Sequence, residues 1–186
     1  MTVGDVMRNG HNRRYYENRN KKTFFVHFDR ATIIASPLTI VFLYEETLRY
    51  YAKPELAAAV IGVLIQLGNT GFTSTGFSYR NSSCYPSVSH VNGEAIDIKY
   101  SGNYKLSGAS QPNEIANDVN VIRWLYKFGF RKTIIGNNNY HNSIYSNLPT
   151  ANRVDMIEGR NNAHDNHIHS YHFEIRKTPI IYGNNN

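Results

Sequence analysis

The sequence predicts an α+β fold, in which helices flank a small central antiparallel sheet. Residues 95–100 put Ile96, Ile98 and Tyr100 on one side and Asp97 on the other, which is the period of a half-buried strand. Two other stretches predict helices instead. Residues 54–67 are apolar nearly throughout, and residues 114–128 carry apolar residues at helical spacing. Each is followed by a glycine that can end a helix.

Length and composition indicate one globular domain, residues 23–186, preceded by a basic, Asn-rich arm, residues 1–22. The chain has 186 residues, 41% of them hydrophobic and 13% aromatic, which suffices for a sizeable core. The arm carries six Lys or Arg residues against two acidic ones and few apolar residues.

Charge and cysteine content exclude several classes of protein. The net charge of +6 fits an anionic partner, either nucleic acid or a cell-wall polymer, or a solvated basic surface with no specific partner. No nucleic-acid-binding motif is present, so we expect no nucleic-acid partner. The single Cys84 excludes a disulfide framework and a Cys-based zinc cluster.

No segment indicates secretion or a stable membrane insertion. The arm lacks the apolar region of a secretory signal, so we expect synthesis in the cytoplasm without a signal peptide. The apolar run 56–67 is too short to span a bilayer and predicts a buried core helix.

The first half of the domain predicts a strand, two helices and a second strand. Residues 23–28 read as a strand, and Pro37 can start a helix that continues over 38–52. Pro54 starts the next helix, through Leu67. Residues 71–79 read as a strand that leads to Arg80.

The second half of the domain predicts three strands and one helix, joined by polar loops. In order these are a strand over 95–100, a polar loop over 101–113, a helix over 114–128, a short strand over 131–135, a long polar loop over 136–160 and a last strand over 167–175. His141, within the long loop, is expected to be solvated.

The stretch His90-Val-Asn-Gly-Glu-Ala-Ile-Asp97 offers an imidazole and a carboxylate, both good zinc ligands. Gly93 gives the turn between them its conformational freedom. Asp97 projects from a strand whose opposite face is apolar, and the small Ala95 beside it leaves room for a metal.

The stretch His164-Asp-Asn-His-Ile-His169 is the predicted partner of the first. On a strand, His167 and His169 share one face and Ile168 lies on the other. A His-x-His pair joined to a distant His and Asp can build a three-ligand zinc site with one open position, which is the catalytic arrangement. Alone, a His-x-His pair is more often a surface strand, so the joint occurrence carries the prediction.

The two stretches resemble a known family. The first fits the H-x-x-G-x-A-x-D signature of LAS-type zinc peptidases, and the second resembles the H-x-x-H-x-H of their D-Ala-D-Ala carboxypeptidase and penicillin-insensitive murein endopeptidase branch. The resemblance covers roughly residues 70–175. It implies Zn²⁺ as cofactor with His90, Asp97 and His169 as ligands. It also implies that His167 stabilises an oxyanion or shuttles a proton, and that His164 lines the same cleft.

Other positions match the family less well. Phe77-Ser-Tyr-Arg80 is similar to the family's Ser-Gly-Tyr-Arg, whose Arg faces the substrate, and a guanidinium can clamp a carboxylate or carbonyl. A surface Arg at a strand end is the alternative. Many members carry an acid as general base where this chain has Asn166. His167, His164 and Asp165 are the candidates for that role.

The resemblance implies a zinc metallopeptidase that hydrolyses peptidoglycan stem-peptide bonds involving D-alanine, as a D,D-endopeptidase or a D,D-carboxypeptidase. Without a signal peptide, such an enzyme fits a phage lysis enzyme or a secreted antibacterial toxin domain. It would act in the periplasm or cell wall after delivery, with an immunity or delivery protein as partner. Two alternatives stay open: a non-catalytic zinc-binding module of the same fold, and a metal-free basic domain that binds nucleic acid.

Overall fold

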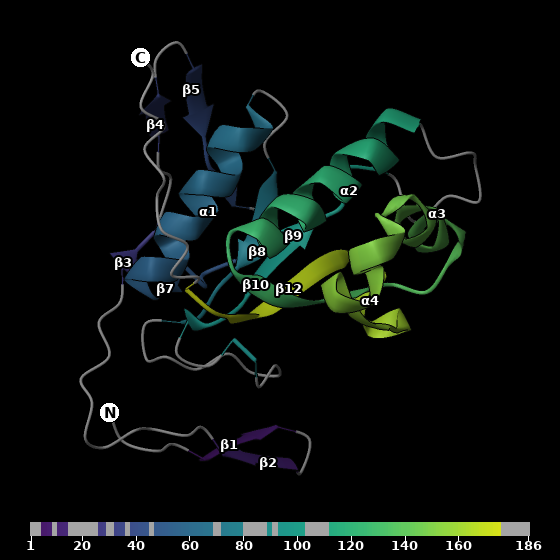
Figure 1. Cartoon of the computed structure of the whole chain (residues 1–186). Coiled ribbons are helices and arrows are strands. Elements are labelled where there is room, and N and C mark those ends of the chain that lie inside the picture. The colour runs from purple at the N-terminus through teal and green to yellow at the C-terminus, as the bar shows by residue number, and fades with distance from the viewer. Residues whose placement is uncertain are drawn as a thin grey trace.

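The computed structural model describes residues 5–8, 11–14, 26–28, 32–35, 38–44, 47–68, 72–79, 89–90, 93–102 and 112–175. Within these ranges the fold is α+β, as predicted, with one larger sheet, three small two-stranded sheets and four α-helices. Figure 1 shows this arrangement with each element labelled. No helix of the described ranges is long and apolar enough to cross a membrane.

The main sheet has six strands in the order β11-β10-β12-β9-β8-β6. Their bounds are β6 Leu43–Tyr44, β8 Thr73–Gly76, β9 Ile96–Lys99, β10 Phe130–Ile135, β11 Ile157–Arg160 and β12 His167–Phe173. The four central strands pair antiparallel, as expected. The expectation of a wholly antiparallel sheet is wrong at both edges, where β11 runs parallel to β10 and β6 parallel to β8.

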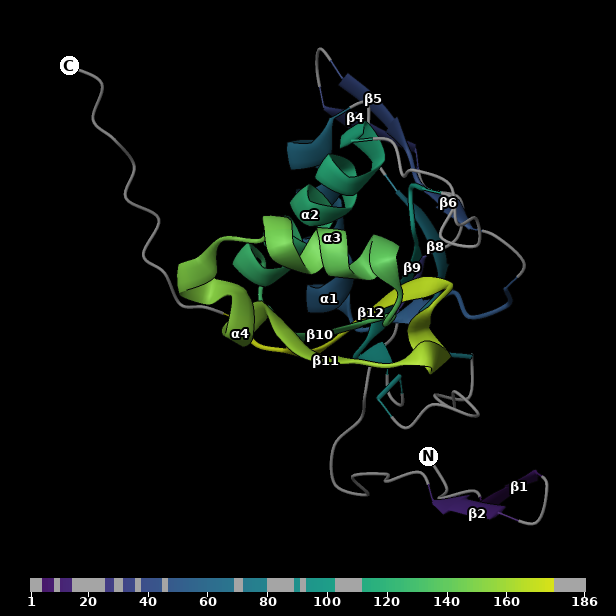
Figure 2. The same cartoon turned by 90° about the vertical axis from the view of Figure 1, so that its right-hand side faces the viewer.

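Helices α1 (Pro54–Leu67), α2 (Pro112–Lys127) and α3 (Asn139–Asn147) gather on one side of the central strands, as Figure 2 shows. The core lies between these helices and the sheet. It includes the fully buried Ile96, Ile98 and Ile168 from the central strands. Because side chains alternate along a strand, the neighbours of these isoleucines belong to the opposite face, away from the helices.

The long polar loop predicted over 136–160 is wrong, because that stretch is mostly structured. It contains α3, a 3-10 turn (Thr150–Asn152), the short helix α4 (Arg153–Met156) and β11. The side chain of Asn138 caps α3 by accepting from the backbone N–H groups of Tyr140 and His141. A parallel β10–β11 pair needs such a crossover, so α3 and α4 explain the parallel edge.

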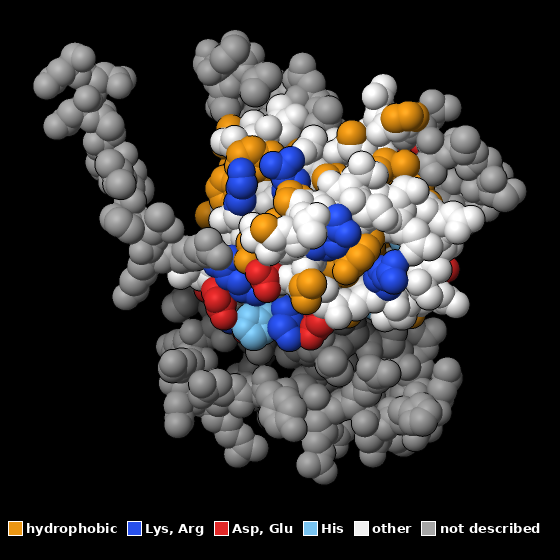
Figure 3. Space-filling model, turned by 45° about the vertical axis from the view of Figure 1, so that its right-hand side comes forward, with side chains coloured by type: hydrophobic (Ala, Val, Ile, Leu, Met, Phe, Trp, Pro, Cys, Tyr) orange, Lys and Arg blue, Asp and Glu red, His pale blue; other side chains and the backbone are white. Residues whose placement is uncertain are grey.

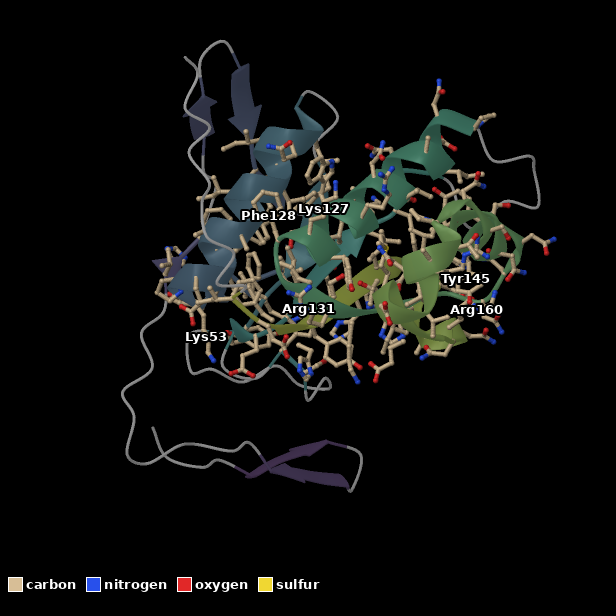
Figure 4. All side chains as sticks on the ribbon, viewed as in Figure 1. Lys53, Lys127, Phe128, Arg131, Tyr145 and Arg160 are labelled. Atoms are coloured by element: carbon tan, nitrogen blue, oxygen red, sulfur yellow. The ribbon has the colours of Figure 1, made fainter. Side chains whose placement is uncertain are left out.

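Cation–π contacts of Tyr145 with two arginines hold helix α3 against β11. The Tyr145 ring lies 4.8 Å from the Arg160 guanidinium and 5.1 Å from that of Arg153. Figure 4 shows Tyr145 and Arg160 next to each other, and Arg160 also donates to the Asn142 side chain. This packing sets the position of the crossover that precedes the histidine-rich strand.

The helix predicted over 38–52 is wrong as well. Residues Leu38–Val41 form β5, which pairs with β4 (Thr32–Ala35), and β7 (Tyr51–Ala52) pairs with β3 (Val26–His27). The run from Leu38 to Tyr44 is rich in β-branched and aromatic residues, which favour strands. The remaining two-stranded sheet, β1 (Asp5–Arg8) with β2 (His11–Arg14), lies within the predicted arm.

Candidate metal centre

Strands β9 and β12 place Asp97 and His169 side by side. Their antiparallel register pairs these two residues directly across the sheet, with Ile98 opposite Ile168 on the core side. Both Asp97 and His169 are buried, so the site does not lie on an exposed patch.

His90 reaches the same point from a tight turn. Gly93 ends this turn with φ of 64° and donates its N–H to the carbonyl of His90 at 3.1 Å. A Cβ at Gly93 would lie 2.8 Å from the Cα of Ala52 and 2.9 Å from the carbonyl oxygen of Tyr51. Both the backbone angle and the close approach therefore require glycine, and the predicted turn is confirmed.

The donors of His90, Asp97 and His169, the inner triad, lie within 4.8 Å of one another. Asp97 Oδ1 is 2.7 Å from His169 Nδ1 and 2.9 Å from His90 Nε2, and the two nitrogens are 3.1 Å apart. Two ligand atoms around a tetrahedral zinc ion are about 3.3 Å apart. The triangle thus needs to widen by only about 0.5 Å to hold an ion.

The protonation of the inner triad also fits a metal, which binds only deprotonated donors. Burial lowers the pKa of His90, which leaves a neutral imidazole at pH 7. Burial opposes ionisation of Asp97, but His90 and His169 overcome it and hold the pKa of that carboxyl well below its usual range. Two imidazoles and one carboxylate form a donor set that zinc accepts.

Side chains around the inner triad orient its members. Ser89 Oγ lies 2.7 Å from His169 Nε2, so the other nitrogen of that ring is free to face Asp97. Arg49 donates from Nη2 to Asp97 Oδ2 at 2.9 Å and to the carbonyl of Thr75 at 2.6 Å. Within the described ranges, the Nδ1 atom of the buried His90 has no hydrogen-bond partner.

Arg49 is the site residue that sequence reasoning missed. It lies 48 positions before Asp97, within the stretch expected to be a helix. No local pattern of charges or spacing marks it as a partner of a metal ligand. The ion pair depends on the pairing of β8 with β9, which brings Thr75 and Asp97 together.

His164 and His167 lie next to the inner triad, as predicted. Their rings are 4.9 Å apart, and His167 Nε2 is 3.6 Å from Asp97 Oδ1. Burial, together with His167 and His169, lowers the pKa of His164 to about 4, and burial also lowers the pKa of His167. Both imidazoles are therefore neutral at pH 7.

Asp165 does not reach this cluster. Its Oδ1 accepts the backbone N–H of Asn137 at 2.9 Å and lies 3.6 Å from Nδ1 of His141. His141, expected to be solvated, is fully buried beside the Tyr100 ring because it lies on the buried side of α3. Arg80 lies outside the described residues, so its predicted place at the substrate is neither confirmed nor contradicted.

The chain matches no known protein family, and no curated protein is significantly similar to it. The geometry of the two histidine motifs therefore carries the functional interpretation.

Proposed function

We propose that the chain is a zinc metallopeptidase that hydrolyses peptidoglycan stem-peptide bonds involving D-alanine. The observation that supports this most is the convergence of His90, Asp97 and His169, which stand up to 79 positions apart, on one buried triangle. The resemblance of both motifs to LAS-type peptidases supplies the substrate class. Bound zinc would supply Lewis-acid chemistry that polarises a carbonyl and activates water.

His167 is the proposed general base. Its Nδ1 lies 2.6 Å from Asn166 Oδ1, and an amide oxygen can only accept, so that nitrogen carries the proton. The unprotonated Nε2 then faces Asp97, where it can take a proton and pass it to the leaving amine. Asn166 stands where many LAS-type peptidases carry an acid as general base. Here it would instead orient the neighbouring His167, which is the proposed base.

His164 and Arg80 have supporting roles in this proposal. His164 stands beside His167 and lines the cleft. Arg80 would hold a substrate carboxylate or carbonyl through its two parallel N–H donors. If Arg80 binds the terminal carboxylate of the substrate, carboxypeptidase action is favoured. If it binds an internal carbonyl of the substrate, endopeptidase action is favoured. A phage lysis enzyme or a delivered antibacterial toxin domain, acting at the cell wall, is the proposed context.

A non-catalytic zinc-binding module is the second candidate, and Asn166 is the observation that favours it. Nucleic-acid binding has less support. On the face in Figure 3, Lys and Arg side chains are scattered among uncharged ones, and at the lower edge they stand beside Asp and Glu side chains. A chance histidine motif would also not be expected to converge with a distant Asp on a buried site.

The decisive experiment is a digest of purified sacculi with the zinc-loaded protein, read by mass spectrometry. Cross-linked dimers that fall to monomers indicate an endopeptidase, and loss of a terminal alanine alone indicates a carboxypeptidase. His90→Ala should bind no zinc in the inner triad and cleave nothing, whereas His172→Ala, an exposed histidine further along β12, should behave as the wild type. Unchanged sacculi with zinc bound would leave the non-catalytic module as the better interpretation.

His167→Ala separates catalysis from metal binding. We expect it to keep zinc, because the inner triad is intact, and to lose roughly 10²- to 10⁴-fold in activity, which is the usual contribution of a general base. Zinc content is measured together with the turnover of a cross-linked muropeptide. Activity near the wild-type level would remove His167 from the mechanism.

A further inference from the structure

We propose that His164, His167 and His169, the outer triad, form a second divalent-cation site, and that an ion bound there inhibits the inner one. The ligating atoms of the outer triad also lie within 4.8 Å of one another. The binding of a second ion is inferred from these histidines alone. Only its inhibitory effect rests on the proposed peptidase function.

The donors of the outer triad are three imidazoles without a carboxylate. The His164 ring centroid lies 4.9 Å from that of His167 and 5.4 Å from that of His169. Imidazole ligands suit zinc, copper, nickel and cobalt, and disfavour magnesium and calcium. The site is therefore expected to take borderline transition-metal ions.

Both added histidines are oriented as metal-bound histidines usually are. The Nδ1 atoms of His164 and His167 lie 2.6 Å from the side-chain oxygens of Asn161 and Asn166, respectively. A ligating histidine almost always donates its other ring N–H to such an oxygen, which fixes the tautomer. The same arrangement on two neighbouring rings leaves two Nε2 lone pairs available.

Two of the three histidines of the outer triad are partly exposed to solvent, whereas all three members of the inner triad are buried. The His167 side chain is 20% exposed and His164 is half-buried, while the His90 side chain has no exposed surface. An ion from solution can therefore reach the outer triad without opening the inner one. Both triads share His169, so the inner ion would take its Nδ1 and the outer ion its Nε2, the atom that faces Ser89. One ring can bind two ions only as an imidazolate, so the remaining ring proton is released to solvent when the second ion binds. This deprotonation and the repulsion between two neighbouring ions make the second ion the weaker one.

Filling the outer triad has a direct chemical consequence. A cation coordinated by Nε2 of His167 occupies the lone pair that would accept the proton. His167 can then no longer act as general base, while the ion in the inner triad stays in place. Excess metal is thus expected to suppress turnover without displacing the first ion.

The test is a titration of the metal-free full chain with Co²⁺, followed by electronic absorption and by native mass spectrometry. The wild type should bind two ions, the second more weakly. His164→Gln and His167→Gln should each keep the first ion and weaken the second at least about 100-fold, more than the loss of an outer-shell partner usually costs. The control His172→Gln, altered at a half-exposed histidine of the same strand, should bind both ions as the wild type does.

Saturation at one ion in the wild type would overturn the second site. So would a second ion that both variants bind as tightly as the wild type, with far-UV circular dichroism used to verify that each variant is folded. Inhibition of sacculus cleavage by excess Zn²⁺ is measured separately. If no zinc concentration gives cleavage, the proposed peptidase fails, while the titration still decides whether the outer triad binds an ion.

Discussion

Among single residues, Arg49 determines how the ionised Asp97 is held when no metal is present. The Arg49 side chain is 17% exposed and that of Asp97 8%, so the pair is largely removed from water. Removing one partner of a buried ion pair leaves the other charge uncompensated and costs about 3–5 kcal/mol. Arg49→Met is expected to lose about that much free energy of unfolding in chelator at pH 7.

The Arg49 prediction is measured by urea unfolding with and without zinc. Zinc should restore much of the loss, because a cation in the inner triad compensates Asp97. The matched control is Lys132→Met, which removes the exposed Lys132–Glu158 pair and should cost less than about 1 kcal/mol. Equal losses in the two variants would show that the Arg49–Asp97 pair has no special role.

At the scale of elements, the turn that carries His164 and Asp165 is hydrogen-bonded to the connection between β10 and α3. The Tyr100 hydroxyl accepts from the N–H of Gly136 at 3.0 Å and donates to the carbonyl of His164 at 3.2 Å. From the other side, Asp165 accepts the N–H of Asn137. Contacts with these neighbouring segments therefore help to position the turn, in addition to its internal hydrogen bonds from the N–H groups of His164 and Asp165.

Gly136 makes this fastening possible, and replacing it should disturb the site. A Cβ at Gly136 would lie 2.2 Å from Cε1 of His141 and 2.4 Å from Asp165 Oδ1. Gly136→Ala is expected to lower the free energy of unfolding by about 1–3 kcal/mol, as overpacking does. Gly159→Ala in the adjacent β11 is the control, because nothing lies within 4 Å of its Cβ position. Denaturant unfolding of both variants measures the effect. A smaller loss of unfolding free energy for Gly136→Ala than for Gly159→Ala would contradict the packing around Gly136.

Asp118 links α2 to its neighbours and gives them a pH dependence. Its carboxyl accepts from the Tyr140 hydroxyl on α3 and from the N–H of Ser101. Burial raises the pKa of Asp118 to about 6 from 3.8, against the effect of these hydrogen bonds. A raised pKa means that the folded state prefers the protonated form, so this contribution to stability is full below about pH 4 and is lost as the pH rises through 6.

The Asp118 prediction is a comparison with Asp118→Asn, which cannot ionise. Between pH 4 and pH 7 the wild type should lose roughly 2 kcal/mol relative to the variant. Urea unfolding at several pH values, in chelator so that no metal contributes, gives this difference. Two parallel pH profiles would mean that Asp118 ionises as easily in the folded chain as in the unfolded one.

For the whole molecule, a metal in the inner triad would join three separate parts of the chain. His90 comes from a turn, Asp97 from β9 and His169 from β12. Zinc at 100 times its Kd should add about 2.7 kcal/mol to the free energy of unfolding and raise Tm by roughly 5–10 °C. Thermal melts in zinc and in chelator measure this shift. His90→Ala should show a clearly smaller shift, due to the outer triad alone, and a wild-type shift in that variant would place the stabilising ion elsewhere than the inner triad.

The sequence predicted what is encoded locally. Helix α1 begins and ends at the predicted residues because Pro54 and Gly68 mark its two ends, and the ligands of the inner triad stood in two short motifs. Pairing between distant segments was not predictable. The parallel edges of the sheet, the Arg49–Asp97 contact and the burial of His141 all depend on which segments meet. The β-branched residues within 38–41 favour the observed strand, and Pro37 can begin a helix but does not require one.

The direct pairing of His169 with Asp97 has one more consequence. Side chains alternate between faces, so a slip of β12 by one residue against β9 would turn Ile168 toward the metal and send both histidines into the core. A chain paired in that way could not hold an ion. Bound metal would therefore select the correct strand register, because it stabilises only the molecules in which β9 and β12 are paired in that register.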